Sequence, residues 1–266
     1  MNSSHSKNDL FEKNGFFIEK NLFNENEIIK WRREINRLHE AADILRKSRT
    51  FEESDFQIEP FVEKSKVKSP ILRKIENTQN HSKLFFQLAR HESLVSIIKD
   101  LLGPDLLLFR STLMLKPALH GSEHAFHQDG SYWPMDPPNL VTVSIAIDES
   151  TVENGCIKVI PESHLSELKN WGNIAKPPDS KSIGPKKANL PNQIEVPLLP
   201  GSALFFHSKL IHGSGPNKSN HSRNTALYAY FNPQVRYVPQ KGMPHSISFP
   251  VIAGLGGAKK FEMTVG

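Results

Sequence analysis

The sequence changes character at Gly103-Pro104, and this change limits the folds that the chain can adopt. Before it, apolar residues recur at helical spacing. After it come about eight short apolar or alternating segments, separated by turn signals such as Asn154-Gly155 and Pro200-Gly201, which is the pattern of a sandwich or jelly roll. Helices followed by strands favour an α+β chain, mainly β, with the helices packed on one face of the β core. The expected strands are 106–115, about 124–128, 140–147, 156–160, 194–198, 202–206, about 209–212 and 225–231.

The N-terminal part predicts helices with recognisable ends. Asn24 is a good N-cap and Glu27 completes a capping box, so a helix is expected over about 25–46. The other expected helices are a short turn within 10–18, one over roughly 79–90 and one over roughly 92–102 that ends at Gly103-Pro104. Asn14-Gly15 predicts a turn followed by a strand at 16–18. Residues 47–69 are charged and irregular, which favours a surface loop.

The length and composition fit one globular domain. The chain has 266 residues, of which 38% are hydrophobic and 23% charged, and β domains of this size are often single. We expect a helical part over about 8–103, a jelly-roll core over about 104–233 and a C-terminal tail over 234–266. A long polar connection at 161–193 interrupts the strand series, as lids and binding loops often do.

The same composition argues against several classes of protein. No apolar stretch approaches the roughly 18–20 residues that span a bilayer, and the polar start has no signal core. Cys156 is the only cysteine, so an intramolecular disulfide is excluded and a cytoplasmic location is expected. The net charge of +5 is spread over the chain without a basic stripe, so no nucleic-acid partner is expected. The oligomeric state is not predicted.

The chemistry is expected at His127-Gln128-Asp129. Side chains two residues apart share one face of a strand, so His127 and Asp129 can bind one metal ion. A histidine from a distant strand would complete the two-histidine, one-carboxylate set typical of non-haem Fe(II) oxygenases, and His212 is the best candidate. Arg223 follows eleven residues later, and its planar fork suits a carboxylate.

Other residues near these motifs have simpler interpretations. His207 competes with His212 as a ligand but lacks the Gly-x-Gly turn that follows His212. His120 and His124 could support the metal ligands or contact the substrate, but surface or packing roles are favoured for them, and a structural role is expected for His164. Tyr132 and Trp133 are as consistent with a pocket wall as with packing, and Cys156 with a buried position.

Together these motifs resemble the phytanoyl-CoA dioxygenase family of Fe(II)/2-oxoglutarate oxygenases, which have a double-stranded β-helix, or cupin-like jelly-roll, core. The resemblance covers about residues 8–233. One departure is Glu162, where the family usually has glycine before Ser-His. The matching segments are His127-Gln-Asp129, Asn154-Gly-Cys-Ile-Lys-Val-Ile-Pro-Glu-Ser-His164, Pro200-Gly201, His212-Gly-Ser214 and Arg223.

The resemblance implies a role for each matching residue. His127, Asp129 and His212 would bind Fe(II), and Arg223 with Ser214 would bind the distal carboxylate of 2-oxoglutarate. Looser matches place Gln128, Lys74 and Thr112 near the cosubstrate.

The implied reaction uses O₂ to hydroxylate an aliphatic carbon of a small-molecule metabolite, with release of succinate and CO₂. Asp129 favours hydroxylation, because related halogenases have a small residue at that position. Desaturation, oxidative cyclisation and a non-catalytic metal-binding module remain alternatives, and no membrane partner is expected.

Overall fold

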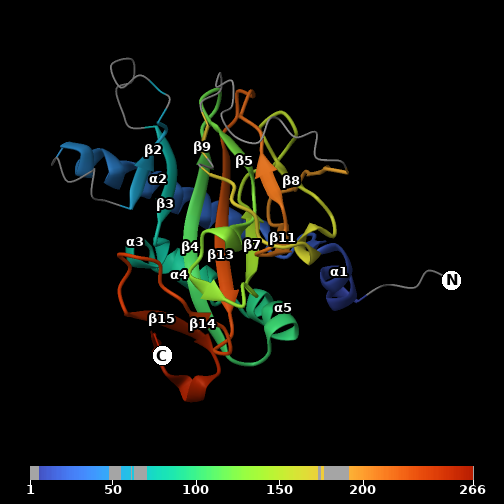
Figure 1. Ribbon diagram of the computed structural model, residues 1–266. Helices are drawn as coiled ribbons and strands as arrows, with labels where there is room; N and C mark the ends of the chain where they lie inside the picture. The colour runs from blue at the N-terminus through green and yellow to red at the C-terminus, as the bar shows by residue number, and fades with distance from the viewer. Residues whose placement is uncertain are drawn as a thin grey trace.

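The computed structural model describes residues 6–47, 55–60, 62, 71–172, 175–176 and 192–265. Within these ranges two antiparallel sheets form the core, and helices cover the outer face of the larger one. The larger sheet has the strand order β1-β11-β7-β13-β4-β15-β16, with β3 also paired to β4 and β2 to β3. The smaller sheet has the order β10-β8-β12-β5-β9. Figure 1 shows β4 and β13 side by side through the centre of the molecule. The predicted jelly-roll class is confirmed.

The strands alternate between two environments, and this alternation separates the core from the site. The strands of the larger sheet are β1 (Phe16–Glu19), β2 (Phe56–Ile58), β3 (Leu72–Glu76), β4 (Leu106–Lys116), β7 (Val141–Ala146), β11 (Ala203–His207), β13 (Arg223–Phe231), β15 (Ser246–Ala253) and β16 (Lys260–Thr264). On β7, Val141, Val143 and Ile145 pack in the core beneath the helices. Thr142 and Ser144 point the other way, because successive side chains alternate across a sheet.

The smaller sheet closes over that second face. Its strands are β5 (Glu123–His127), β8 (Ile157–Val159), β9 (Ala175–Lys176), β10 (Ile194–Val196) and β12 (His212–Ser214). A short ribbon of β6 (Met135–Asp136) and β14 (Arg236–Tyr237) flanks the two sheets. Val159, Val196, Leu204, Phe206 and Leu210 belong to one apolar cluster that joins the sheets.

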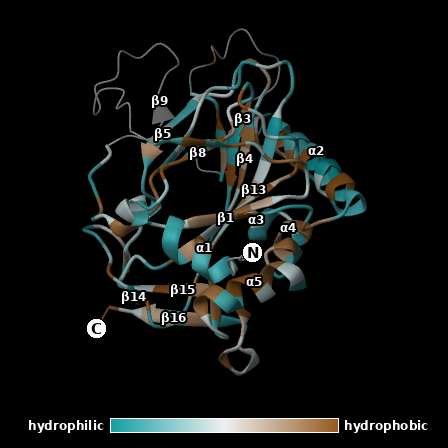
Figure 2. Cartoon of the chain, turned by 90° about the vertical axis from the view of Figure 1, so that its right-hand side faces the viewer, coloured by the Kyte–Doolittle hydropathy of each residue, from teal (hydrophilic) through white to brown (hydrophobic). Residues whose placement is uncertain are grey.

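The helices α1 (Lys7–Asn14), α2 (Glu25–Lys47), α3 (Thr78–His81), α4 (Lys83–Leu88) and α5 (Glu92–Leu102) bury apolar faces against the larger sheet. In Figure 2, α2 carries both teal and brown residues, as expected for an amphipathic helix. The predicted capping box is present: Glu27 N donates to Asn24 Oδ1 at 3.1 Å, and Asn24 N donates to Glu27 Oε2 at 2.9 Å. Tyr228 and Tyr230 of β13 donate hydrogen bonds to Phe85 O and Ala89 O of the helical layer. No helix in the described ranges has the length and apolar content that crossing a bilayer requires.

Several predicted boundaries are wrong. The helix expected over 79–90 is two helices, because Ser82 has extended backbone and its hydroxyl caps α4 by accepting from Phe85 N. The strand expected at about 209–212 begins only at His212, since the preceding residues form a turn. Part of the loop expected at 47–69 is strand β2, and most of that loop and of 161–193 lies outside the described residues.

The C-terminal segment is also more ordered than a tail. β15 pairs with β4 and β16 pairs with β15, so the segment extends the larger sheet. Pro250 lies within β15. A proline in an expected strand argues against that strand, which explains why the sequence did not predict it.

The departure at Glu162 has a conformational cost. Glu162 has φ +65° and precedes the 3₁₀ turn Ser163–Leu165, and its N–H donates to Asn14 O. Residues with a Cβ rarely adopt this left-handed backbone, whereas glycine does so freely. The family's usual glycine therefore fits this turn better than the glutamate does.

We expect Glu162→Gly to raise the free energy of unfolding by about 0.5–1 kcal/mol, because it removes the left-handed strain. Denaturant titration would measure the change. Glu162→Ala is the matched control: it removes the same charge but keeps the Cβ, so no comparable gain is expected. Equal effects of the two variants would mean that charge, and not backbone strain, determines the result.

Candidate metal and cosubstrate site

Three predicted ligands meet in one cavity between the sheets. One ligand atom from each of His127, Asp129 and His212 lies within 4.8 Å of the others. His127 Nε2 is 3.5 Å and His212 Nε2 is 3.9 Å from Asp129 Oδ1. His127 ends β5, and His212 begins β12 directly opposite it in the antiparallel register. Asp129 lies two residues beyond His127, in a 3₁₀ turn and not in the strand.

Backbone carbonyls fix the orientation of both imidazoles. His127 Nδ1 lies 2.9 Å from Ala125 O, and His212 Nδ1 lies 3.0 Å from Leu210 O. A carbonyl can only accept, so each Nδ1 carries the proton and each Nε2 presents a lone pair to the space beside Asp129. Burial, with His127 nearby, lowers the pKa of His212 to about 4, which keeps this ring neutral at pH 7. Imidazoles oriented in this way are suitable metal ligands.

The carboxylate of the triad is oriented too. Thr142 Oγ1 of β7 donates to Asp129 Oδ2 at 3.0 Å, which leaves Oδ1 facing the two histidines. Burial alone would raise the pKa of Asp129, but His212, His127 and Arg110 outweigh it and lower the value to about 2. The donor set, the fixed tautomers and the ionised carboxylate therefore fit a divalent first-row metal such as Fe(II).

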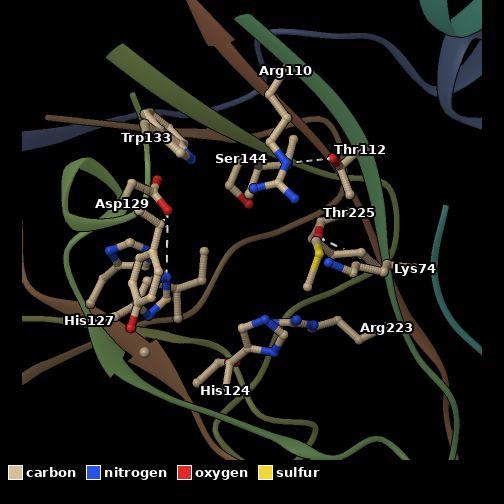
Figure 3. A pocket seen from close by; sticks show the side chains of 17 residues that line it. Lys74, Arg110, Thr112, His124, His127, Asp129, Trp133, Ser144, Arg223 and Thr225 are labelled. Carbon is tan, nitrogen blue, oxygen red and sulfur yellow. Dashed lines mark hydrogen bonds and ion pairs between the residues drawn. The ribbon is translucent and has the colours of Figure 1, made fainter. Parts of the chain in front are cut away.

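The cavity has a volume of about 230 Å³. Its wall is formed by alternate residues of β4, β7 and β13, with β3, β5 and β12 closing the sides; Figure 3 shows these side chains. The lining residues are Lys74, Arg110, Thr112, Met114, His124, His127, Asp129, Tyr132, Trp133, Ser144, Ile157, His212, Gly213, Ser214, Arg223, Thr225 and Leu227.

The sheet register orders the wall into rows. One row joins Thr142, Ala229 and Arg110, the next joins Ser144, Leu227 and Thr112, and the third joins Ala146, Thr225 and Met114. Arg223 lies beyond the third row, opposite Lys116. Asp129 accepts a hydrogen bond from Thr142 of the first row, so the triad and Arg223 lie toward opposite ends of this wall.

Arg223 is buried with part of its hydrogen-bonding capacity unused. Its Nη1 donates to Gly155 O at 2.7 Å, and its Nε has no partner among the described residues. Burial lowers its pKa to about 10, so it remains charged at neutral pH. A buried guanidinium with an unpaired donor is costly unless an anion reaches it. A carboxylate of 2-oxoglutarate fits this end of the cavity.

A second buried basic residue, Lys116, lies opposite Arg223 on the neighbouring strand β4. Lys116 is 3% exposed, and its ammonium donates to Ser122 O at 2.9 Å, Ser214 O at 3.4 Å and Gly215 O. Its own burial first, and then the nearby Arg223, lower its pKa well below the usual value. Glu59 attracts Lys116 and accepts from Ser122 N, so it offsets part of this charge. The sequence did not predict Lys116 as part of the site.

The other predicted cosubstrate residues lie in different surroundings. Ser214 lines the cavity on β12, in the same wall as the triad histidine. Thr112 lines it as well, but its hydroxyl donates to Glu76 Oε2 at 3.0 Å. Lys74 lies opposite Met114, in the third row, with its ammonium 2.5 Å from Glu76 Oε1.

Gln128 does not line the cavity. Its side chain is fully buried and points to the opposite side of β5, where it bonds the connection that follows the 3₁₀ turn at 163–165. Its Nε2 donates to Glu167 O and Lys209 O, and its Oε1 accepts from Lys169 N and Trp171 Nε1. No hydrogen-bonding group remains for a cosubstrate, so the expected contact is not formed.

The histidines outside the triad divide between core, surface and cavity. His207 ends β11 with its ring 5.6 Å from that of His164, whose Nε2 lies 2.9 Å from Glu12 O. Within the described residues, the metal-binding cluster does not include His207. His120 is exposed, as expected. His124, however, lines the cavity with its Nδ1 2.9 Å from Arg73 Nη2, which agrees with the alternative that the sequence left open and not with the favoured surface or packing role.

Sequence reasoning also missed Thr142, Ser144 and Arg110. Each carries a signal in the sequence: two hydroxyls interrupt the apolar run of β7 at alternate positions, and one arginine lies inside the apolar run of β4. Polar residues at period two in a buried strand mark the face that lines a site.

Thr142→Val should weaken Fe(II) binding about tenfold or more while leaving the fold intact, because it removes the hydroxyl that orients Asp129 and changes little volume. Anaerobic Fe(II) titration would measure this. Thr225→Val is the matched control: Thr225 is a buried threonine of the neighbouring strand β13 on the cavity side, but its hydroxyl donates to Met114 O at 3.4 Å and not to a ligand of the triad. Equal Fe(II) affinities of the two variants would show that Thr142 does not position the ligand.

Gln128→Met should lower the free energy of unfolding by about 2–4 kcal/mol, because several buried backbone groups lose their partner. Its Fe(II) affinity should stay close to that of the unchanged protein, since the Gln128 side chain points away from the triad. Denaturant titration and Fe(II) titration would measure the two effects. A loss of Fe(II) affinity without a loss of stability would contradict this assignment.

Comparison with known proteins agrees with the fold and assigns the chain to a family. The model of the family described as phytanoyl-CoA dioxygenase (PhyH) matches residues 11–225. The peroxisomal phytanoyl-CoA dioxygenase of Rattus norvegicus is 26% identical over 280 residues, covering 96% of this chain and 78% of that protein. The ectoine dioxygenase of Stutzerimonas stutzeri is 24% identical over 238 residues, covering 84% of this chain and 74% of that protein.

A solved structure has the same fold. It is the epimerase SnoN in complex with Fe³⁺, alpha-ketoglutarate and nogalamycin RO, with a TM-score of 0.65, 20% identity and coverage of 89% of this chain and 86% of that chain. Because the family model matches most of the sequence, the chain belongs to the phytanoyl-CoA dioxygenase (PhyH) family.

Proposed function

We propose that the chain is an Fe(II)- and 2-oxoglutarate-dependent oxygenase that hydroxylates an aliphatic carbon of a small-molecule metabolite. The observation that carries the proposal is the shared cavity of the oriented triad and Arg223. The triad would hold Fe(II), and Arg223 with Ser214 would hold the far carboxylate of 2-oxoglutarate. Bound Fe(II) would activate O₂, and 2-oxoglutarate would supply the electrons as it is converted to succinate and CO₂.

The chain's own contribution is orientation and exclusion of water. Ala125 O and Leu210 O keep the Nε2 atoms aimed at the metal. Thr142 keeps Asp129 turned toward it. Three protein ligands leave positions for the cosubstrate and O₂, as expected for a facial triad. The names of the relatives, dioxygenases acting on phytanoyl-CoA and ectoine, support a small-molecule substrate.

Desaturation and oxidative cyclisation would use the same residues. One of the structures with this fold is an alpha-ketoglutarate-dependent carbocyclase, so these outcomes are measured together with hydroxylation. Product mass separates them: hydroxylation adds one oxygen, whereas desaturation and cyclisation remove two hydrogens.

His212→Gln should abolish Fe(II)-dependent succinate formation from 2-oxoglutarate, because an amide cannot replace the oriented imidazole. His207→Gln is the matched control, five residues earlier and outside the cluster, and it should retain that turnover in the fraction that folds. Succinate release per folded protein, with folding followed by circular dichroism, is the measurement. Turnover that depends on His207 and not on His212, or that survives removal of Fe(II) by a chelator, would overturn the proposal.

A further inference from the structure

We propose that Arg110 binds an oxyanion group of the substrate, so that the substrate is a small aliphatic acid or its phospho analogue. This proposal rests on the function proposed above and specifies its substrate class. Arg110 lies in the middle of β4, and its guanidinium enters the cavity from the side that also carries Trp133 and Ser144 (Figure 3).

Arg110 is held rigidly by one edge of its guanidinium. Nε and Nη2 donate to the two oxygens of Glu76 at 3.2 and 2.6 Å, and Nε also lies 3.2 Å from Thr112 Oγ1. Nη1 makes no hydrogen bond with any residue that the structure describes, and the side chain is 34% exposed. An arginine fixed on one edge and open on the other is preorganised to bind an anion.

The surroundings of Arg110 keep a positive charge. Lys74 and Arg110 share the single carboxylate of Glu76. Although burial would raise the pKa of Glu76, Arg110 and Lys74 lower it to about 2, so the carboxylate is ionised. Two cations and one anion leave this group of three with a net charge of +1. Asp129 also interacts with Arg110, but in the Fe(II)-loaded protein its charge would be matched by the metal ion. An anionic ligand would neutralise the group of three.

The register separates this charge from the cosubstrate end. Arg110 lies opposite Ala229, and Arg223 lies opposite Lys116, six positions away along the same strands (229 − 223 and 116 − 110). This corresponds to roughly 20 Å between the two positions on the backbone. Arg110 instead shares its row with Thr142, the residue bonded to Asp129. An anion at Arg110 therefore lies on the metal side of the cavity, away from Arg223.

A second unpartnered group lies beside Arg110. Ser144 is 1% exposed, and its Oγ has no hydrogen-bond partner within the described ranges. It lines the cavity in the row next to Arg110. A buried hydroxyl without a partner is costly. An oxyanion bonded to Arg110 Nη1 and Ser144 Oγ would satisfy both groups, and Trp133 and Tyr132 would contact the aliphatic part of the same molecule.

The test is binding of three matched probes, hexanoate, hexylphosphonate and hexanamide, to the Fe(II)-loaded protein saturated with 2-oxoglutarate, measured anaerobically by calorimetry. At least one of the two anions should bind ten or more times as tightly as the amide. The anion that binds more tightly shows whether the oxyanion group of the substrate is a carboxylate or a phospho group. Equal binding of the amide, or no binding of any probe, overturns the proposal.

Substitutions of single arginines then test which residue contacts the anion. Arg110→Gln should weaken the preferred anion at least tenfold while changing the dissociation constant of 2-oxoglutarate less than threefold. Arg223→Gln should do the reverse. Arg236→Gln, which removes one exposed charge paired with Asp136, controls for net charge. If Arg110→Gln weakens 2-oxoglutarate and not the anion, Arg110 belongs to the cosubstrate subsite and the proposal fails.

Two further measurements separate the causes of a negative result. Arg110→Lys keeps the charge beside Glu76 but cannot bond both Glu76 and a ligand, so it should weaken the anion even if Arg110→Gln does not fold. Quenching of Trp133 fluorescence in the metal-free protein, with Trp133→Phe as the blank, reports anion preference without iron. If the protein failed to bind 2-oxoglutarate but still preferred the anions to the amide, only the proposed oxygenase function would be overturned.

Discussion

The site depends on the antiparallel pairing of β12 with β5. This pairing places His212 opposite His127, so two residues 85 positions apart in the sequence (212 − 127) present their Nε2 atoms to one point. A slip of one residue would turn the side chain of His212 to the other face of the smaller sheet, because side chains alternate with period two. The apolar cluster of Val159, Leu204 and Phe206 between the two sheets holds this register.

The larger sheet extends the same alternation to the rest of the site. One face of β7 and β13 packs against the helices through residues such as Val143 and Tyr228. The other face carries Ser144 and Arg223 into the cavity and brings the Thr142 hydroxyl to Asp129. The apolar face gives the sheet a rigid support, and the polar face gives each functional group a fixed row. The distance between the metal end and the Arg223 end is therefore a property of strand register and not of loop conformation.

Most of this architecture could be predicted from the sequence. The strand series, the helix at 25–46 and the capping box at Asn24 follow from periodicity and local hydrogen bonding, which act over a few residues. The break at Ser82 and the strand containing Pro250 could not be predicted in the same way. The break at Ser82 has a local cause, the serine N-cap of α4, which the continuous helical spacing over 79–90 conceals. The strand containing Pro250 depends on tertiary pairing with β4, which overrides the local preference of the chain.

The residues of the candidate site also fall into those that the sequence could predict and those that it could not. His127 and Asp129 are close in sequence, so their shared site follows from local geometry. Gln128 lies between them, yet its side chain points away from the cavity. There the segment 167–171 and the turn at Lys209 together satisfy its hydrogen bonds. Thr142 and Arg110 are isolated in apolar strands, and only the sheet register shows which residues they reach. Charge pairs such as Arg110–Glu76 join β4 to β3 and have no signal in the sequence.

The distribution of buried charge connects stability with function. Arg223, Lys116 and Arg73 are all buried, and the carboxylates that attract Lys116 are the buried Glu59 and the half-buried Glu123, two anions for three cations. Removing cations from water without matching anions destabilises the fold. That cost is already present in the folded protein, so a dicarboxylate entering the cavity would gain the attraction without having to organise the cations first. Because the same reasoning applies to Arg110 at the metal end, the two cationic ends would each select an anion. The triad beside Arg110 would then hold the metal ion close to the substrate, and the cosubstrate would reach the same metal ion from the Arg223 end.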